Sequence, residues 1–162
     1  MGRYRPLVRA LVQHTNTVSR TATKRREMAP GIEISSQEWQ LLEYVIEHED
    51  NIDNMNRVAE GLGIPQSCIS KDTKHLCQIG LLERYKEKDN KKNIILKASQ
   101  KGRAFYNDFS GRIMSKSFEV LFRELEGLSD EALAQFTHAL ETYNLSRLAP
   151  REKQLVRIEE EE

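Results

Sequence analysis

Apolar side chains recur along most of this chain at the three- and four-residue spacing of amphipathic helices. The first stripe predicts a helix from Tyr4 to about Arg26, which the segment from Met28 to Gly31 ends. Ser35 and Glu38 then form a capping box that predicts the start of a second helix. The apolar positions of the first stripe are Tyr4, Leu7, Val8, Leu11 and Val12.

Shorter elements follow an acidic, polar stretch over residues 47–54, which is interpreted as a turn. Gly80 suits a left-handed helix stop, and Asp89 beside Asn90 suits a turn between two strands. The remaining predicted elements are helices over residues 54–62 and 65–79, strands over residues 82–87 and 93–97, and two helices that begin at Ser99 and Ser129. The predicted order is four helices, two strands and two helices.

Residues 54–79 have the features of a helix-turn-helix. Ala59 is small enough for a helix contact, Gly63 permits a positive φ in the turn, and apolar residues can anchor the second helix from behind. The exposed side of that helix can reach base edges or phosphates, because Gln pairs with adenine, Lys pairs with guanine and Ser is tolerant. The predicted DNA-contacting residues there are Gln66, Ser67, Ser70, Lys71 and Lys74.

Formal charge is segregated along the 162 residues, although Lys+Arg and Asp+Glu balance at 25 each. Residues 1–30 carry seven basic residues and one acidic residue, and residues 66–103 carry ten and four. A local basic stripe can attract phosphate even when the whole molecule is neutral. The strand-loop-strand adds further predicted DNA contacts at Lys86, Lys88, Asp89, Lys91 and Lys92.

Residues 36–101 resemble the winged-helix core of the multiple-antibiotic-resistance regulator (MarR) family of transcription factors. The helix-turn-helix of the family resembles Ala59-x-x-Leu62-Gly63-Ile64, and its wing resembles Leu76-x3-Gly80-Leu81-Leu82-Glu83-Arg84 followed by Asp89-Asn90-Lys91-Lys92. The start of the next family helix resembles Ser99-Gln100-Lys101-Gly102. Lys91 and Lys92 stand where the family usually has Arg, and Asp72 stands where it usually has an apolar residue.

The resemblance implies a mainly α-helical protein with a small β-wing, in the α+β class: a winged helix-turn-helix with dimerisation helices at both ends. The expected parts are an N-terminal dimerisation helix (1–30), the DNA-binding core (31–101), C-terminal dimerisation helices (102–148) and a polar tail (149–162). The expected partners are a second copy of the chain, a pseudo-palindromic double-stranded DNA operator and an unidentified small-molecule effector that releases a repressor.

Other kinds of site have little support in the sequence. No phosphate loop, nucleophile elbow or paired acid and base is present, so neither an enzyme nor a cofactor is expected. The histidines have no metal-ligand spacing, and a cluster of His48 with nearby acids is interpreted as a solvated turn. No apolar run is long enough to cross a membrane, and two cysteines fit a reducing, cytoplasmic setting.

Several alternatives remain open at this stage. Trp39, Tyr44, Phe105 and Phe109 fit either an effector pocket or core packing. Cys68 fits a small core cysteine better than an oxidant sensor, because the sensing cysteine of such relatives lies in the first helix. A winged helix can also act as a protein-docking module or as a nonspecific DNA-binding protein, but the basic wing beside a basic helix favours an operator-binding regulator.

Overall fold

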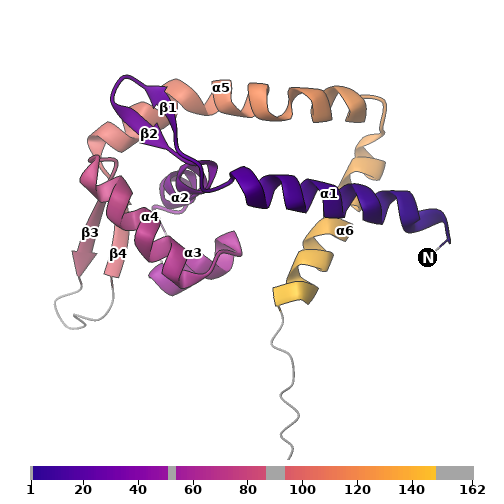
Figure 1. The fold of residues 1–162 in the computed structure, drawn as a ribbon, viewed down its shortest axis with the longest axis horizontal. Coiled ribbons are helices and arrows are strands. Elements are labelled where there is room, and N and C mark those ends of the chain that lie inside the picture. Colours follow the sequence, from indigo (N-terminus) through magenta and orange to yellow (C-terminus); the bar gives the residue numbers. More distant parts are fainter. Residues whose placement is uncertain (1, 51–53, 87–93, 149–162) are drawn as a thin grey trace, which may run out of the picture. The chain divides into compact units, whose positions relative to one another are not determined.

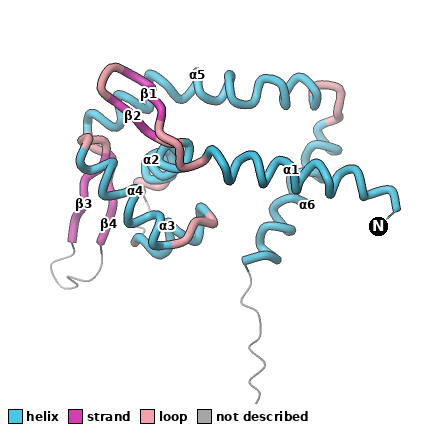
Figure 2. Tube along the Cα trace, in the orientation of Figure 1, coloured by secondary structure: helices cyan, strands magenta, loops and turns pink. Residues whose placement is uncertain are grey.

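The computed structural model describes residues 2–50, 54–86 and 94–148 (Figure 1). Its fold is mainly helical with a small antiparallel wing, as predicted, and a second antiparallel hairpin (Figure 2). The elements are η1 (Gly2–Tyr4), α1 (Arg5–Thr21), β1 (Arg26–Ala29), β2 (Ile32–Ile34), α2 (Ser36–Glu47), α3 (Met55–Leu62), α4 (Gln66–Gln78), β3 (Leu82–Lys86), β4 (Ile94–Ala98), α5 (Gln100–Leu125) and α6 (Asp130–Leu148).

The chain forms two compact units, Met1–Ile113 and Met114–Glu162, whose boundary falls inside α5. In the first unit α2, α3 and α4 pack on one another, and β3 and β4 pair beside them. The apolar faces of these elements are buried together, which removes their side chains from water and stabilises the unit. Its fully buried side chains include Leu41, Leu42, Ile69, Leu76 and Leu81.

The predicted capping box at the start of α2 is confirmed. The Ser35 hydroxyl accepts a hydrogen bond from the Glu38 backbone N–H at 3.1 Å, and the Glu38 carboxylate accepts one from the Ser35 N–H at 2.8 Å. Each bond satisfies a backbone donor that the first helical turn would otherwise leave unpaired.

A hairpin, β1–β2, precedes α2 and was not predicted. The helix expected to reach Arg26 ends at Thr21, and the chain then forms the antiparallel pair Arg26–Ala29 and Ile32–Ile34. Gly31 closes the hairpin with a φ of +73°, which a residue with a side chain rarely adopts. Ile32 and Ile34 are buried in the core while Glu33 between them is exposed, so the hairpin has the alternation of a half-buried strand.

Both ends of the described chain expose apolar side chains. Helix α1 has no buried residue, and its apolar stripe is open to solvent. In the second unit, the rings of Phe118 and Phe122 stack on each other with their centroids 5.9 Å apart, and both are exposed. The other large exposed apolar residues of that unit are Val120, Leu121, Leu128, Leu133, Tyr143 and Leu145.

Candidate nucleic-acid interface

Helices α3 and α4 meet at a glycine turn, as predicted. The Asn54 side chain caps α3 by accepting hydrogen bonds from the backbone N–H groups of Asn56 and Arg57, at 3.0 and 3.1 Å. Gly63 ends α3 in the left-handed region, with a φ of +65°, and the Ile64 N–H donates to the Ala59 carbonyl at 3.0 Å. Only glycine adopts this backbone conformation without strain. The turn therefore directs α4 across α3.

Helix α4 has one exposed side and one buried side. The buried side carries Ile69, Asp72, Thr73 and Leu76. The exposed side is uncharged and polar in the first turn and basic in the middle, so it can offer hydrogen bonds and positive charge to a duplex. All five helix residues predicted to contact DNA are on this exposed side: Gln66, Ser67, Ser70, Lys71 and Lys74.

The β3–β4 hairpin forms the stem of the predicted wing. Its register pairs Leu82 with Ala98 at the base and Lys86 with Ile94 at the last described step. Lys86 is exposed, and the Lys97 ammonium lies over the Tyr85 ring at 5.6 Å from the ring centroid. The other wing residues predicted to contact DNA, Lys88, Asp89, Lys91 and Lys92, lie outside the described residues.

The far end of α4 is braced by the first turn of α5. The Lys101 ammonium donates to the Ile79 carbonyl at 2.8 Å, and the Ser99 hydroxyl donates to the Gly80 carbonyl at 2.6 Å. The Gly102 N–H donates to the same hydroxyl at 2.9 Å, and a Cβ at Gly102 would lie 2.1 Å from the Leu81 carbonyl oxygen. The Ser-Gln-Lys-Gly motif therefore fixes where α4 ends and β3 begins.

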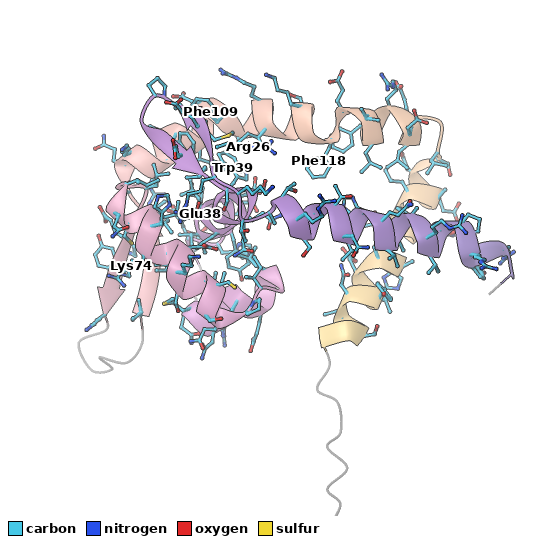
Figure 3. The ribbon with its side chains drawn as sticks, in the orientation of Figure 1. Arg26, Glu38, Trp39, Lys74, Phe109 and Phe118 are labelled. Atoms are coloured by element: carbon cyan, nitrogen blue, oxygen red, sulfur yellow. The ribbon has the colours of Figure 1, made fainter. Side chains whose placement is uncertain are left out.

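A buried carboxylate lies beneath α4. Glu38, labelled in Figure 3, is 1% exposed. Its Oε1 is 2.8 Å from Nδ1 of His75, 2.6 Å from Nη2 of Arg25 and 3.0 Å from Nε of Arg25. Burial raises the pKa of Glu38, but hydrogen bonds from Arg25 and the Ser35 backbone, with the charge of His75, outweigh it. The pKa of Glu38 is therefore below its ordinary value, and the group is an anion at neutral pH.

Asp72 makes a second polar contact between α2 and α4. Its Oδ2 accepts a hydrogen bond of 2.6 Å from Nε2 of Gln37. Burial raises the pKa of Asp72, this hydrogen bond lowers it, and the charge of Glu38 raises it further, so the net shift is upward. The Gln37 amide thus satisfies the buried carboxyl.

Sequence reasoning missed this polar set as a group. The capping box pointed to Glu38 as a helix-start residue only, and nothing in the spacing pointed to Arg25, Gln37 or His75. His75 and Glu38 are far apart in the sequence, and a contact of that kind leaves no periodic signal in a single chain.

Comparison with known proteins agrees with this geometry. Residues 34–102, which run from the end of β2 to Gly102, match the family model described as a winged helix DNA-binding domain. Over these residues the chain is similar to winged-helix DNA-binding domains. Among curated proteins, none matches the sequence significantly.

Solved structures with the same fold extend beyond the winged-helix domain. The MarR/EmrR family transcriptional regulator from Acinetobacter sp. ADP1 has a TM-score of 0.66 and 14% identity, covering 91% of this chain and 98% of that one. The PcaV transcriptional regulator from Streptomyces coelicolor, in complex with its natural ligand, has a TM-score of 0.61 and 17% identity, covering 87% and 91%. MepR of S. aureus, in a DNA complex, has a TM-score of 0.61 and 17% identity, covering 92% and 100%. The chain therefore has the fold of MarR-family regulators.

The aromatic residues of α2 and of the first part of α5 pack on one another. The Trp39 ring meets the edge of Phe105 at 5.8 Å between centroids and stacks on Tyr106 at 5.6 Å. Phe105 in turn contacts Phe109 at 4.9 Å, while Tyr44 stacks on His48. Trp39 and Phe105 are buried, so core packing accounts for both rings, and an effector pocket at these residues stays a prediction.

The two cysteines and the potential metal ligands are the remaining candidates for site chemistry. Cys68 and Cys77 are free and partly exposed, and burial raises the pKa of the Cys77 thiol. Within the part of the chain that the structure describes, no group of three or more His, Cys, Asp or Glu side chains could hold a metal ion. No helix in that same part is long and apolar enough to cross a membrane.

Proposed function

We propose that this protein is a sequence-specific, DNA-binding transcriptional regulator that acts as a homodimer in the cytoplasm, and that it binds DNA without catalysing a reaction. The single observation that carries the proposal is the two-sided α4. Its buried side is anchored to α2 by apolar and polar contacts, and its outer side presents Lys71 and Lys74 with polar residues. A helix held in this way is suited to the major groove of a duplex.

The contact set proposed here comprises the exposed face of α4 and the wing. Gln66, Ser67, Ser70, Lys71 and Lys74 would contact base edges or phosphates, and Lys86, Lys88, Asp89, Lys91 and Lys92 would contact the backbone or the minor groove beside them. The structure of MepR in a DNA complex, which shares this fold, supports DNA as the partner. The geometry of that complex describes how MepR binds DNA and is not transferred to this chain.

Homodimerisation is the proposed role of the two ends of the chain. The exposed stripe of α1 and the exposed aromatic and aliphatic residues of the second unit leave more apolar surface than single exposed side chains require. In a dimer these surfaces would be buried, and two copies of α4 would be held at a fixed spacing. We assign the proposed parts accordingly: residues 1–30 and 102–148 to the dimer, and residues 31–101 to DNA binding.

Control by a small molecule completes the proposal. PcaV, which has the same fold, was solved with its natural ligand. We propose that this chain is likewise a repressor that a small effector releases from its operator.

The test is selection of genomic fragments by the purified full-length protein, followed by footprinting of the best fragment. Protection of an inverted repeat, with half-site centres about 34–36 Å apart, is the expected result for a dimer that inserts two helices. Uniform weak binding without a protected site would overturn the proposal in favour of a nonspecific DNA-binding protein. Absence of DNA binding would leave a protein-docking module.

A further inference from the structure

Two consecutive residues at the start of α2 hold two residues one helical turn apart on α4. Gln37 donates to Asp72 at 2.6 Å, and Glu38 accepts from His75 at 2.8 Å. In sequence, Asp72 and His75 alternate with Lys71 and Lys74 of the outer face. The two contacts therefore hold the inner side of the helix whose outer side carries the proposed DNA contacts.

The same turn of α2 is joined to the segment that follows α1. The Gln37 N–H donates to the carbonyl of Ala22, the residue that caps α1, at 3.1 Å. Arg25 donates to Glu38 through Nε and Nη2, at distances from 2.6 to 3.1 Å. Glu38 thus connects the segment between α1 and β1, the start of α2 and the last turn of α4 within the first unit.

The chemistry of the Glu38–His75 contact determines which atom donates. An ionised carboxylate only accepts hydrogen bonds, so Nδ1 of His75 must carry the proton. The amide nitrogen of an Asn side chain can occupy nearly the same position as Nδ1 of His75 and can donate the same hydrogen bond. A Leu side chain is of similar size but cannot donate.

Stability alone does not explain a charged group at this position. Replacing a buried ion pair with apolar residues of similar volume is often neutral or stabilising, because the desolvation cost of the pair is removed. A directional contact does limit rotation of the helix. Side-chain tips lie about 5–6 Å from a helix axis, so a rotation of roughly 20° moves them by about 2 Å, enough to break a hydrogen bond.

We propose that Glu38 is a positioning residue for DNA recognition: through His75 it fixes the rotation of α4 about its axis, and through Arg25 it ties that setting to the segment between α1 and β1. This inference rests on the proposed DNA-binding function. It adds a residue that does not touch DNA but determines how well Lys71, Lys74 and their neighbours meet the bases.

The first experiment compares full-length wild type with Glu38→Gln, His75→Leu and His75→Asn, using the footprinted operator and a scrambled duplex over a range of salt. Misalignment of one base contact costs about 1–3 kcal/mol, so Glu38→Gln and His75→Leu should lose about tenfold or more in operator affinity. Their affinity for scrambled DNA and their salt slope should stay at the wild-type values, because the phosphate contacts remain. His75→Asn should bind the operator within about twofold of wild type, since it keeps the donor.

Two outcomes would overturn the inference. One is operator affinity unchanged in both Glu38→Gln and His75→Leu. The other is an equal loss for operator and scrambled DNA, which would indicate general damage to the fold. Glu60→Gln, at an exposed position of α3 outside the proposed contacts, is the matched control and should bind as wild type. Far-ultraviolet circular dichroism and thermal unfolding of each variant establish that the protein is folded at the temperature of the binding measurement.

The proposed role of the Arg25–Glu38 contact is tested by a double-mutant cycle. Arg25→Gln should lower operator affinity in the same direction as Glu38→Gln, and the double variant should lose little more than either single one, because both act through one contact. Additive losses would separate Arg25 from Glu38 and overturn this part of the inference. Glu60→Gln serves as the control here as well.

Failure of the inference and failure of the proposed function are distinguishable. A wild-type protein that protects no operator overturns the proposed function, and with it the inference. A wild-type protein that protects an operator, together with variants that bind the same operator equally well, overturns only the positioning role of Glu38.

Discussion

Two buried carboxyl groups where α2 meets α4, those of Glu38 and Asp72, have net pKa shifts in opposite directions. Burial alone raises the pKa of both, but Glu38 gains an arginine, a histidine and a backbone N–H, whereas Asp72 gains the neutral amide of Gln37 and a repulsive neighbour in Glu38. The net pKa shift is therefore downward for Glu38 and upward for Asp72. The ionised form of Asp72 is the less favoured of the two in the folded protein.

The Asp72→Asn variant should be more stable than wild type at pH 7. An upward pKa shift means that Asp72 supports folding most below its unfolded pKa, about 3.9, and loses that support as the pH rises through the folded pKa. The advantage of the variant should thus shrink on acidification and vanish below about pH 3.9. Urea unfolding between pH 3.5 and 8 measures it, with the exposed Glu60→Gln as control. A constant gain at every pH would contradict the assignment.

Gly102→Ala should destabilise the protein by about 1–3 kcal/mol, the usual cost of forcing extra atoms into a packed site. The added Cβ would meet the Leu81 carbonyl at 2.1 Å, and backbone cannot move aside as a flexible side chain can. Gly111→Ala is the matched control in the same helix, because nothing lies within 4 Å of its Cβ. That control should gain about 0.5–1 kcal/mol. Chemical denaturation of both variants decides the matter, and equal effects would exclude the clash.

Single residues differ in how far the sequence predicts them. The exposed positions of Gln66, Ser70 and Lys74 follow from helical periodicity, because the buried neighbours Ile69 and Leu76 mark the other side. The pairing of Glu38 with His75 could not be predicted, since it depends on how α2 crosses α4. One chain contains no signal for a polar contact between such distant residues.

Among the elements, the helix-turn-helix and the wing stem were predictable, and the β1–β2 hairpin was not. Each of its strands is only three or four residues long, too short for alternation to stand out from chance. The buried, exposed, buried order of Ile32, Glu33 and Ile34 was the available signal. The first helix ends at Thr21 because its apolar stripe fades after Val18 and Thr is a weak helix former.

The two lysines on the exposed face of α4 are expected to make DNA affinity depend on salt concentration. Replacing Lys71 and Lys74 together by Ala should weaken binding to every duplex and lower the slope of log affinity against log salt by about two units, if each side chain neutralises one phosphate. Filter binding or fluorescence anisotropy between about 50 and 200 mM salt measures the slope. Lys116→Ala, exposed on α5, should leave it unchanged. A wild-type slope in the double variant would remove both lysines from the phosphate contacts.

At the scale of the whole molecule, the segregation of charge along the chain is visible in the sequence, but the division into units is not. The boundary at Ile113 and Met114 falls inside α5, which is continuous from Gln100 to Leu125. A helix that belongs to two units has no break in its local pattern, so no residue marks the change. The apolar stripes of α1 and the second unit are exposed in the single chain, and their burial in a dimer stays a prediction.

Charge introduced into the stripe of α1 should abolish the proposed dimer. Val8→Asp with Val12→Asp places two carboxylates on a surface that is exposed in the single chain, so the winged-helix unit should fold as before. Burying unpaired charge in an interface is costly, and dimer affinity should fall by about 100-fold or more. Sedimentation equilibrium measures the change, with the exposed polar substitution Thr15→Asp as control. A double variant that still sediments as a dimer would exclude α1 from the interface.

The two sides of α4 have separate tasks, and this has a consequence for redesign. The anchoring residues Ile69, Asp72, His75 and Leu76 face the rest of the domain, while the outer residues, proposed to contact DNA, are exposed. Binding preference could therefore be reprogrammed by exchanging only the outer residues, at Gln66, Ser67, Ser70, Lys71 and Lys74. A library confined to those five positions would sample new target sequences on an unaltered scaffold.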